Sequence, residues 1–250
     1  CCRGVDTVFH EAALASVPRS VADPFMSNLH NIDGTLTVLI GARDAGVKRL
    51  VYAASSSAYG DSETLPKHEA MPCKPMSPYA VQKYVGEMYL KIFSDLYGLS
   101  TIGLRYFNIF GPRQDPKSQY AAVIPIFITK LLAGEAPTIN GDGEYSRDFT
   151  YIENVVHANI LAAETPDPGG VTVNVACGDR FTLNELYEAI QENAGKRLEP
   201  IHGEVRAGDV PHSMADISLA REVIGYEPLV DFKTGLAQTV SWYMAQAARV

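Results

Sequence analysis

The stretch Ser77-Pro78-Tyr79-Ala80-Val81-Gln82-Lys83 decides how this chain folds. Serine commonly caps the N-terminus of a helix, and proline is favoured in the first helical turn. The apolar residues that follow keep helical spacing as far as Gly98, where a helix ends readily. The sequence therefore predicts a helix over residues 78–97, with Tyr79 and Lys83 on one face and one turn apart.

The pair Tyr79 and Lys83 suggests acid–base chemistry. An ammonium close to a phenol favours the phenolate, so we expect Lys83 to lower the pKa of Tyr79 toward neutral pH. A phenol with a lowered pKa can act as a general base. The same two residue types also occur at this spacing by chance on many helices, so the pair needs support from its surroundings.

Polar residues follow two apolar runs that we expect to form buried strands. Ser55-Ser56-Ser57-Ala58-Tyr59-Gly60 comes directly after Leu50-Val51-Tyr52-Ala53-Ala54, upstream of the predicted helix. Arg105-Tyr106-Phe107-Asn108 follows the next apolar run, downstream of that helix. In α/β folds the chemistry gathers at the carboxyl ends of the strands, so we expect these segments to meet near Tyr79.

Four segments in a fixed order make the sequence similar to a known family. They are Ser55 with Tyr79-x-x-x-Lys83, Arg105-Tyr106-Phe107-Asn108, Gly141-Asp142-Gly143 with Arg147-Asp148-Phe149, and Arg206-x-Gly-Asp209. With this combination the chain resembles, over essentially its whole length, the nucleotide-sugar epimerases among the extended short-chain dehydrogenases/reductases. The likeness is greatest to bacterial UDP-N-acetylglucosamine 4-epimerases. It implies an α/β fold with a Rossmann-like parallel sheet, a smaller mixed α/β C-terminal substrate domain, and NAD as the cofactor.

The resemblance also implies a role for each matching residue. Tyr79 would remove the proton of the sugar 4-hydroxyl with help from Ser55, while Lys83 would hold the ribose of NAD and tune Tyr79. The cofactor-binding residues that it implies are Ala12, Asn28, Tyr79, Lys83, Tyr106 and Phe107. The substrate-binding residues that it implies are Ala15, Ser16, Ser56, Ser57, Asn108, Ala122, Val123, Asn140, Arg147, Arg206, Asp209 and Ser213.

Several of these residues also have an ordinary structural explanation. Ser16 stands in a stretch that is either a loop toward the substrate or a helix cap. Asn28 can be a surface residue on a helix. Arg147 and Arg206 can clamp a diphosphate bidentately or form surface ion pairs with the aspartates beside them.

Small and polar side chains narrow the expected reaction. Ser56 and Ser57 fill positions where related dehydratases hold an Asp-Glu pair that supplies the acid for losing water, which disfavours a dehydratase. Ala15, Ala122 and Ser213 are small residues at sugar-lining positions, and Ser213 replaces the tyrosine of epimerases restricted to UDP-glucose and UDP-galactose. We therefore expect NAD-dependent C4 epimerisation of a UDP-hexose through a 4-keto intermediate, with UDP-N-acetylglucosamine and UDP-N-acetylgalactosamine as the substrates. A UDP-glucuronate epimerase or decarboxylase and a non-catalytic nucleotide-sugar-binding fragment are the alternatives.

Two domains are expected. Residues 1–120 form a partial NAD-binding Rossmann domain with return segments near 150–178, and residues 121–250 form mainly the nucleotide-sugar-binding domain. No G-x-G-x-x-G or G-x-x-G-x-x-G fingerprint follows a first strand. We therefore expect a fragment that lacks about the first three strands of such a sheet.

Gly141-Asp142-Gly143 is typical of the tight turn of a β-hairpin.

Composition restricts the partners. The 250 residues include 46% hydrophobic ones, as in globular proteins, and the net charge of −8 argues against nucleic acid. No run of about 18 apolar residues suggests a membrane span. The four cysteines match no zinc or disulfide pattern, which favours reduced thiols in the cytoplasm and no metal. The resemblance implies a homodimer through a four-helix bundle of the helices that start near Asn28 and Ser77.

Overall fold

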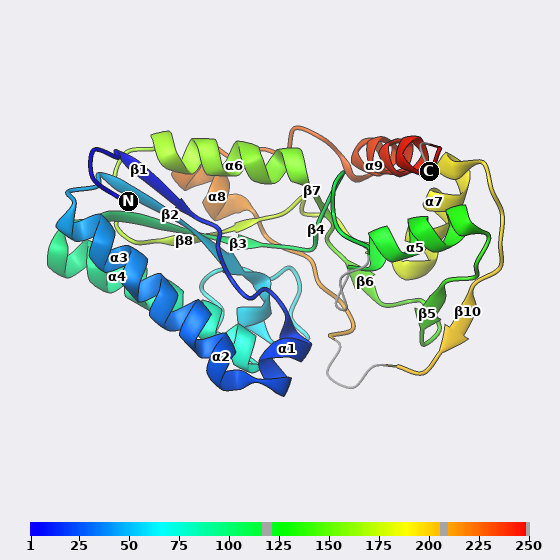
Figure 1. Ribbon diagram of the computed structural model, residues 1–250, viewed down its shortest axis with the longest axis horizontal. Coiled ribbons are helices and arrows are strands. Elements are labelled where there is room, and N and C mark those ends of the chain that lie inside the picture. Colours follow the sequence, from blue (N-terminus) through cyan, green and yellow to red (C-terminus); the bar gives the residue numbers. More distant parts are fainter. Residues whose placement is uncertain (117–121, 206–209, 249–250) are drawn as a thin grey trace.

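The structure, a computed structural model, describes residues 1–116, 122–205 and 210–248. Its larger part is built on a parallel sheet (Figure 1). Each strand pairs in parallel with its neighbour, which confirms the expected Rossmann-like α/β fold. In spatial order the strands are β1 (Thr7–His10), β2 (Arg49–Ser55), β3 (Ser100–Tyr106) and β8 (Thr172–Val175).

Helices cover both faces of this sheet (Figure 1). Because successive strand side chains point to opposite faces, Leu50 and Tyr52 of β2 pack against one pair of helices, while Val51 packs against the other. Burial on both faces is typical of parallel sheets. The first pair is α3 (Gly34–Asp44) and α4 (Pro78–Tyr97), and the second is α6 (Ile152–Glu164) and α8 (Ser218–Ile224). The chain reaches α3 through α1 (Val17–Ala22), α2 (Pro24–Asn28) and a π-helical segment, Leu29–Asp33.

Helix α4 begins and ends where the sequence predicts. The Ser77 hydroxyl accepts a hydrogen bond from the backbone N–H of Ala80 at 3.2 Å, and Gly98 ends the helix with a left-handed φ of 67°. Gly86 lets α4 lie close to the sheet, because a Cβ atom there would stand 2.3 Å from the Tyr52 hydroxyl. Helix α4 therefore packs closely against β2.

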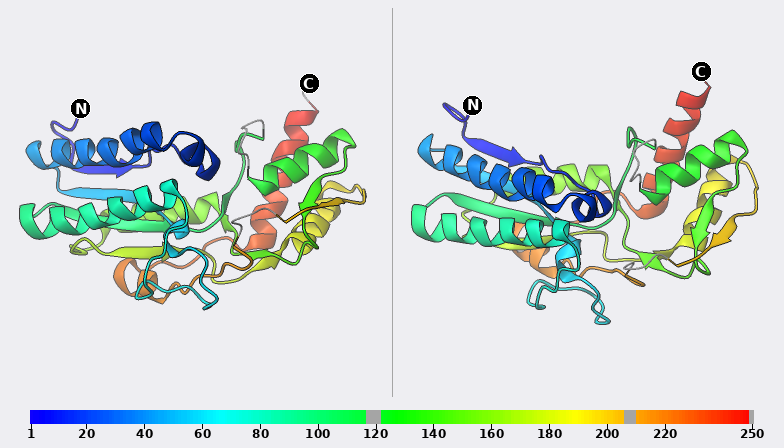
Figure 2. Two further views of the ribbon diagram at one scale, coloured as in Figure 1. Left: turned by 90° about the horizontal axis from the view of Figure 1, so that it is seen from below. Right: turned by 60° about the horizontal axis from the view of Figure 1, so that its bottom comes forward.

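The smaller part of the molecule lies beside the sheet along the long axis (Figures 1 and 2). Its core contains Phe110, Phe127, Leu186 and Leu236, contributed by segments far apart in the sequence. Its helices are α5 (Val123–Ala133), α7 (Leu183–Ala194) and α9 (Phe232–Ala247). Its short strands pair as β4 (Ile109–Phe110) with β7 (Thr150–Tyr151), β5 (Thr138–Asn140) with β10 (Ile201–Gly203), and β6 (Ser146–Arg147) with β9 (Phe181–Thr182).

The hairpin expected at Gly141-Asp142-Gly143 is wrong. Both glycines have left-handed φ angles, 68° and 82°, so the chain does turn there. However, β5 pairs in parallel with β10 and β6 pairs antiparallel with β9, so the two strands that flank the turn do not pair with each other. Each of the two strands pairs instead with a strand that is distant in the sequence, β10 for β5 and β9 for β6.

Asp148 ties the two parts together. Its carboxylate, fully buried, accepts hydrogen bonds from the backbone N–H groups of Cys177 and Gly178 at 3.0 Å each and of Ala215 at 3.2 Å. Cys177 follows β8 of the large sheet, and Ala215 belongs to a segment that packs with α8 on that sheet. The chain therefore returns to the sheet twice, through residues 150–178 and again through 215–226.

Candidate active site

A cavity of about 650 Å³ opens at the carboxyl ends of β2 and β3, lined by both parts of the molecule. The size is that of a small-molecule site. Most of the residues singled out from the sequence meet here. Those that line it are Ala15, Ser55, Ser56, Ser57, Tyr79, Tyr106, Phe107, Asn108, Arg147 and Ser213.

A second cavity of about 240 Å³ adjoins the first. Asn108 and Arg147 line both, and Ala122, Val123 and Asn140 line the second one. Asn108 has a φ of 28° and is held there by donating to the backbone oxygen of Asp148 at 2.9 Å. Asparagine tolerates this left-handed region better than most residues do. The Arg147 guanidinium donates to the backbone oxygens of Ser146 and Pro211 at 2.9 and 3.0 Å.

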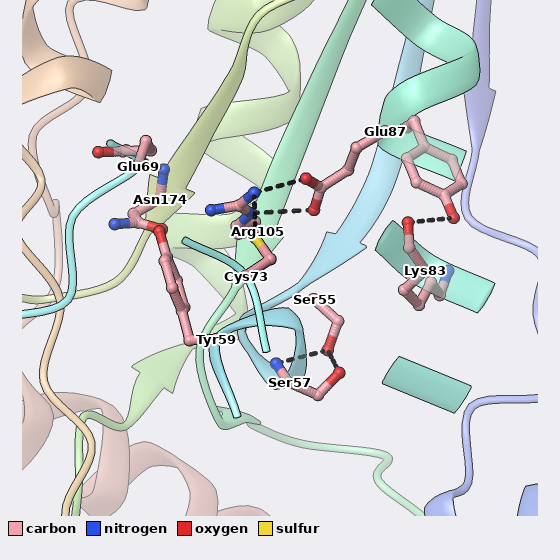
Figure 3. A network of polar contacts seen from close by, with 10 residues as sticks. Ser55, Ser57, Tyr59, Glu69, Cys73, Lys83, Glu87, Arg105 and Asn174 are labelled. Carbon is pink, nitrogen blue, oxygen red and sulfur yellow. Dashed lines mark hydrogen bonds and ion pairs between the residues drawn. The ribbon is translucent and has the colours of Figure 1, made fainter. Parts of the chain in front are cut away.

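The serine turn after β2 presents hydroxyls to the cavity. The Ser55 and Ser57 hydroxyls lie 2.8 Å apart, and Ser55 also caps the short turn by accepting from the Ser57 backbone N–H at 3.3 Å (Figure 3). Gly60 ends the turn with a φ of 63°, in a position where a Cβ atom would stand 1.9 Å from the backbone oxygen of Lys74. Only glycine fits such a site, so the turn keeps its shape.

Tyr79 lies at the start of α4 and faces Ser55. Burial raises the pKa of Tyr79, and a hydrogen bond with the Ser55 side chain lowers it. The expectation that Lys83 sets the Tyr79 pKa is therefore wrong for this structure. Burial has the larger effect, and the Lys83 ammonium points to the backbone oxygen of Ala53 instead, at 2.7 Å.

Lys83 is not part of the cavity lining, although it follows Tyr79 by one turn of α4. It is 3% exposed, and its ammonium stands 4.8 Å from the centroid of the Tyr52 ring. Burial lowers the pKa of Lys83 to about 8, while the charges of Glu11 and Glu87 raise it. The position one turn after Tyr79 is the one the sequence predicts.

An ion pair that sequence reasoning missed supports this region from α4 and β3. Arg105 donates to both carboxylate oxygens of Glu87 at 2.9 and 2.6 Å, and both side chains are buried (Figure 3). The guanidinium lies 4.7 Å from the centroid of the Tyr59 ring, and the Tyr59 hydroxyl donates to Asn174 at 2.7 Å. The spacing of Glu87 four residues after Lys83 was the available signal.

Glu11 is a second carboxylate that the sequence did not single out. It follows β1, and the Tyr106 hydroxyl donates to its two oxygens at 3.1 and 3.3 Å. The Asn159 amide from α6 donates to the same hydroxyl at 2.8 Å. Burial raises the pKa of Glu11, whereas Tyr106 and Lys83 lower it.

A few predicted residues stand apart from both cavities. Ser16 caps α1 by accepting from the Arg19 backbone N–H at 3.2 Å, which is the helix-cap alternative. Ala12 is exposed after β1, and Asn28 is half-buried at the end of α2. Arg206 and Asp209 lie outside the described residues. Among the residues that the structure does describe, no group of three His, Cys, Asp or Glu side chains is placed to hold a metal ion.

Comparisons of this chain with a family model, with curated proteins and with solved structures all point to one family. A family model described as "NAD dependent epimerase/dehydratase family" matches residues 2–176. The UDP-glucose 4-epimerase of Mycolicibacterium smegmatis is 40% identical over 239 residues, which cover 95% of this chain and 76% of the relative. The solved UDP-N-acetylglucosamine 4-epimerase of Methanobrevibacter ruminantium, in complex with UDP-N-acetylmuramic acid, is 45% identical with a TM-score of 0.94 over 98% of this chain and 78% of that one. The solved MoeE5 in complex with UDP-glucuronic acid and NAD is 33% identical with a TM-score of 0.92, covering 98% and 81% of the two chains. With a family model over well above half of its length and a relative at 40% identity along nearly all of it, this chain belongs to the NAD-dependent epimerase/dehydratase family.

Proposed function

We propose that this protein catalyses the NAD-dependent C4 epimerisation of a UDP-hexose, with UDP-N-acetylglucosamine and UDP-N-acetylgalactosamine as its substrates. One observation carries the proposal: Tyr79, Ser55 and Asn108 converge on one cavity from α4, β2 and the end of β3, with Lys83 buried one turn after Tyr79. Membership of the NAD-dependent epimerase/dehydratase family indicates NAD as the cofactor. The two epimerases named above act on UDP-sugars.

The residues around Lys83 fit NAD. An ammonium has three N–H donors, and Ala53 accepts one of them, which leaves donors for the ribose hydroxyls of a dinucleotide. Bound beside Lys83, NAD would supply the hydride acceptor and donor for C4 of the sugar. Tyr79 takes the proton of the 4-hydroxyl, and the hydrogen bond with Ser55 favours its ionised form. Tyr106 and Phe107 line the same cavity, and we assign both to the cofactor side. Ala12 and Asn28 do not line it and are assigned to the cofactor from the sequence alone.

The UDP part of the substrate is assigned to the second cavity and its entrance. Asn108 and Arg147 stand where the two cavities meet, and an arginine there provides positive charge for a diphosphate in an otherwise acidic protein. Ala122, Val123 and Asn140 line the nucleotide end. We assign Arg206 and Asp209 to the same end from the sequence, and Ser16, Ser56 and Ser57 to the sugar side.

Small lining residues favour an N-acetylated sugar. Ala15 and Ser213 both line the larger cavity, so space is available where a tyrosine would otherwise close it. The similarity to a UDP-N-acetylglucosamine 4-epimerase is consistent with this assignment. UDP-glucuronate is the second candidate, because MoeE5 was solved with UDP-glucuronic acid.

The test is turnover with NAD and one UDP-sugar at a time. Proton NMR of the anomeric signals should show UDP-N-acetylglucosamine converting to UDP-N-acetylgalactosamine. Faster conversion of UDP-glucuronate, or release of carbon dioxide from it, would replace the substrate assignment. UDP binding by calorimetry with no conversion of any UDP-hexose would contradict the proposed activity and indicate a nucleotide-sugar binder.

We further propose a cytoplasmic homodimer. The cysteines are free thiols, as the reducing cytoplasm favours. In the described part of the chain, no helix is both long and apolar enough to span a bilayer. Apolar side chains are exposed along α4, and Ile40 is exposed on α3; these two helices are the ones expected to form a four-helix bundle with a second copy.

A further inference from the structure

We propose that Gln82 and Asn31 are positioning residues: their side-chain amides hold the segment that carries Ala15 against helix α4, and so set the place of one cavity wall relative to Tyr79. This role deepens the proposed function and rests on it only in that Ala15 is assigned to the sugar side. Gln82 lies inside the stretch 77–83 that decides the fold, yet it neither lines the cavity nor takes part in the proposed reaction.

Asn31 binds the backbone of Leu14 in both directions. The Leu14 backbone N–H donates to the Asn31 side-chain oxygen at 2.8 Å, and the Asn31 amide nitrogen donates to the Leu14 backbone oxygen at 3.3 Å. Both backbone groups of Leu14 are therefore paired with a single side chain, which fixes this part of the chain outside any helix or strand. Ala15 comes next and lines the larger cavity, so the contact with Asn31 determines where this wall stands.

Gln82 sets the orientation of Asn31. The Asn31 amide nitrogen donates to the Gln82 side-chain oxygen at 2.8 Å, and the Ser27 hydroxyl donates to the same oxygen at 2.7 Å. Because the Leu14 N–H needs an acceptor and the Gln82 oxygen needs a donor, the Asn31 amide satisfies both in only one of its two orientations. Asn31, Gln82 and Ser27 are all buried, where an unpaired polar group is costly, so the network keeps this one arrangement.

The local fold brings these side chains together. Ser27 belongs to α2, Asn31 to the π-helical segment that follows it, and Gln82 to α4, against which both of those elements pack. Ser27 and Asn31 are four residues apart, and the Asn31 amide also reaches the Ser27 hydroxyl at 3.4 Å. A π-helical turn is rare in proteins and is found frequently at functional sites. Here the π-helical turn carries the residue that grips the cavity wall.

A second contact ties the same segment to the start of α4. The Tyr79 backbone N–H donates to the Ser20 hydroxyl at 3.0 Å, and that hydroxyl donates to the Val17 backbone oxygen at 2.7 Å. The first N–H groups of a helix have no partner within it, and here α1 supplies one. Ser20 is fully buried, while Val17 and Val21 line the larger cavity. Residues 14–21 are therefore fixed to α4 at two points, and both points lie within one turn of the proposed general base.

Amide hydrogen exchange, followed by NMR without any ligand, reads the geometry directly. Gln82→Met removes the oxygen that orients Asn31, and methionine has a similar length with no strong acceptor. The Leu14 amide should then exchange about 2- to 10-fold faster, as expected for a weakened hydrogen bond. An unchanged Leu14 amide in the folded variant would overturn the inference.

Ser20→Ala tests the second point of attachment. It removes the acceptor of the Tyr79 N–H, so the Tyr79 amide should exchange faster by a similar factor, about 2- to 10-fold. This variant decides the question if thermal unfolding shows that Gln82→Met does not fold. Unchanged exchange at Tyr79 would then overturn the inference.

The matched control changes a glutamine with the same role elsewhere. The Gln238 side-chain oxygen accepts from the Tyr151 hydroxyl at 2.8 Å, on α9 in the smaller part of the molecule. Gln238→Met therefore removes an equivalent hydrogen bond between a helix and its neighbour, and should leave the exchange of the Leu14 amide at the wild-type rate. Equal acceleration at Leu14 in Gln238→Met and Gln82→Met would contradict a specific role of Gln82.

Kinetics separate positioning from stability. In Gln82→Met the KM for the UDP-sugar should rise about 2- to 10-fold, more than kcat falls, because the wall on the sugar side is no longer held in place. The Kd of UDP alone, measured by calorimetry, should stay at the wild-type value, since the nucleotide is assigned to the adjoining cavity. A lower kcat with an unchanged KM would indicate loss of folded protein only, and would contradict positioning.

The two hypotheses fail separately. If the Leu14 amide responds to Gln82→Met while the wild-type protein converts no UDP-sugar, the positioning role stands and the proposed epimerase function fails. If the wild-type protein converts the sugar and the Leu14 amide does not respond, only the positioning role fails.

Discussion

Tyr79 combines a buried phenol with a hydroxyl partner and lies a full turn from a buried ammonium. Because burial raises its pKa and Ser55 lowers it, the balance depends on contacts that a linear motif does not contain. The sequence located Tyr79, Lys83 and Ser55 correctly relative to one another, since helical spacing and the end of a strand are local properties. It misjudged the electrostatics, because the direction of the Lys83 side chain toward Ala53 depends on how α4 docks on β2.

We expect Tyr79→Phe to lower epimerase turnover by roughly 10²–10⁴-fold, because the general base is lost while the ring is kept. Binding of UDP, measured by calorimetry, should stay within a few-fold of wild type, since the residues assigned to the nucleotide line the adjoining cavity. Near-normal turnover by the variant would remove Tyr79 from the catalytic role.

Ser213→Tyr should discriminate between substrates. Ser213 lines the larger cavity, and a tyrosine there fills space that an acetamido group would occupy. We expect kcat/KM for UDP-N-acetylglucosamine to fall much more than kcat/KM for UDP-glucose, with Ser213→Thr as the control of similar polarity. An equal loss on both sugars would mean that Ser213 does not control access of the N-acetyl group.

Secondary-structure elements were predicted best where local signals agree. Helix α4 has a capping serine, a first-turn proline, periodic apolar residues and a terminal glycine, and all of them act within the element. The pairing of β5 failed for the opposite reason. Its partner β10 lies some sixty residues along the chain, and turn chemistry at Gly141 carries no information about so distant a strand.

The buried ion pair between α4 and β3 is expected to affect the stability of the fold. Arg105→Met should destabilise the fold by about 3–5 kcal/mol, because it leaves the buried Glu87 carboxylate without its partner. The double variant Arg105→Met/Glu87→Met should recover most of that loss, since it buries no charge. Urea unfolding followed by circular dichroism measures both, and a double variant no more stable than Arg105→Met would contradict this reading.

The same variant should show a defined pH dependence. Burial raises the pKa of Glu87 in the folded protein and Arg105 lowers it, so removing Arg105 raises the folded-state pKa further above its unfolded value. A group with a raised pKa contributes stability that is full below the unfolded pKa and is lost as pH rises through the folded pKa. The loss in free energy of unfolding caused by Arg105→Met should therefore be smallest near pH 4 and grow toward neutral pH.

At the scale of the molecule, the site exists because two separately packed parts are joined around it. Asp148 binds backbone groups that follow β8 and precede α8, and Asn108 hydrogen-bonds to the backbone of Asp148, so the junction also orients a residue assigned to the substrate. The sequence suggested the return of residues 150–178 through a strand and helix pattern. It did not suggest the second return through 215–226. Ala215, Ile217 and Ala220 pack in the core of the larger part, but nothing in their sequence pattern indicates which of the two cores they join.

The outer surface of α4 exposes apolar side chains, which predicts that two copies of the protein associate. Val81, Met88, Ile92 and Leu96 are exposed on α4 at helical spacing, and α3 packs beside α4 on the same side of the sheet (Figure 2). An exposed apolar stripe along a helix is typical of an interface, and two copies would bury it as four helices, with α3 and α4 from each copy. We expect the wild-type protein to sediment as a dimer at micromolar concentration.

The double variant Met88→Lys/Ile92→Lys should sediment as a monomer, because it places two charges per copy in the centre of that interface. The matched control is Val156→Lys/Ile160→Lys, which changes two equally exposed apolar residues at the same spacing on α6, on the opposite face of the sheet. A wild-type monomer would rule out the assembly. A dimer that survives the α4 changes and is lost with the α6 changes would move the interface to the other face, where Phe9 is also exposed.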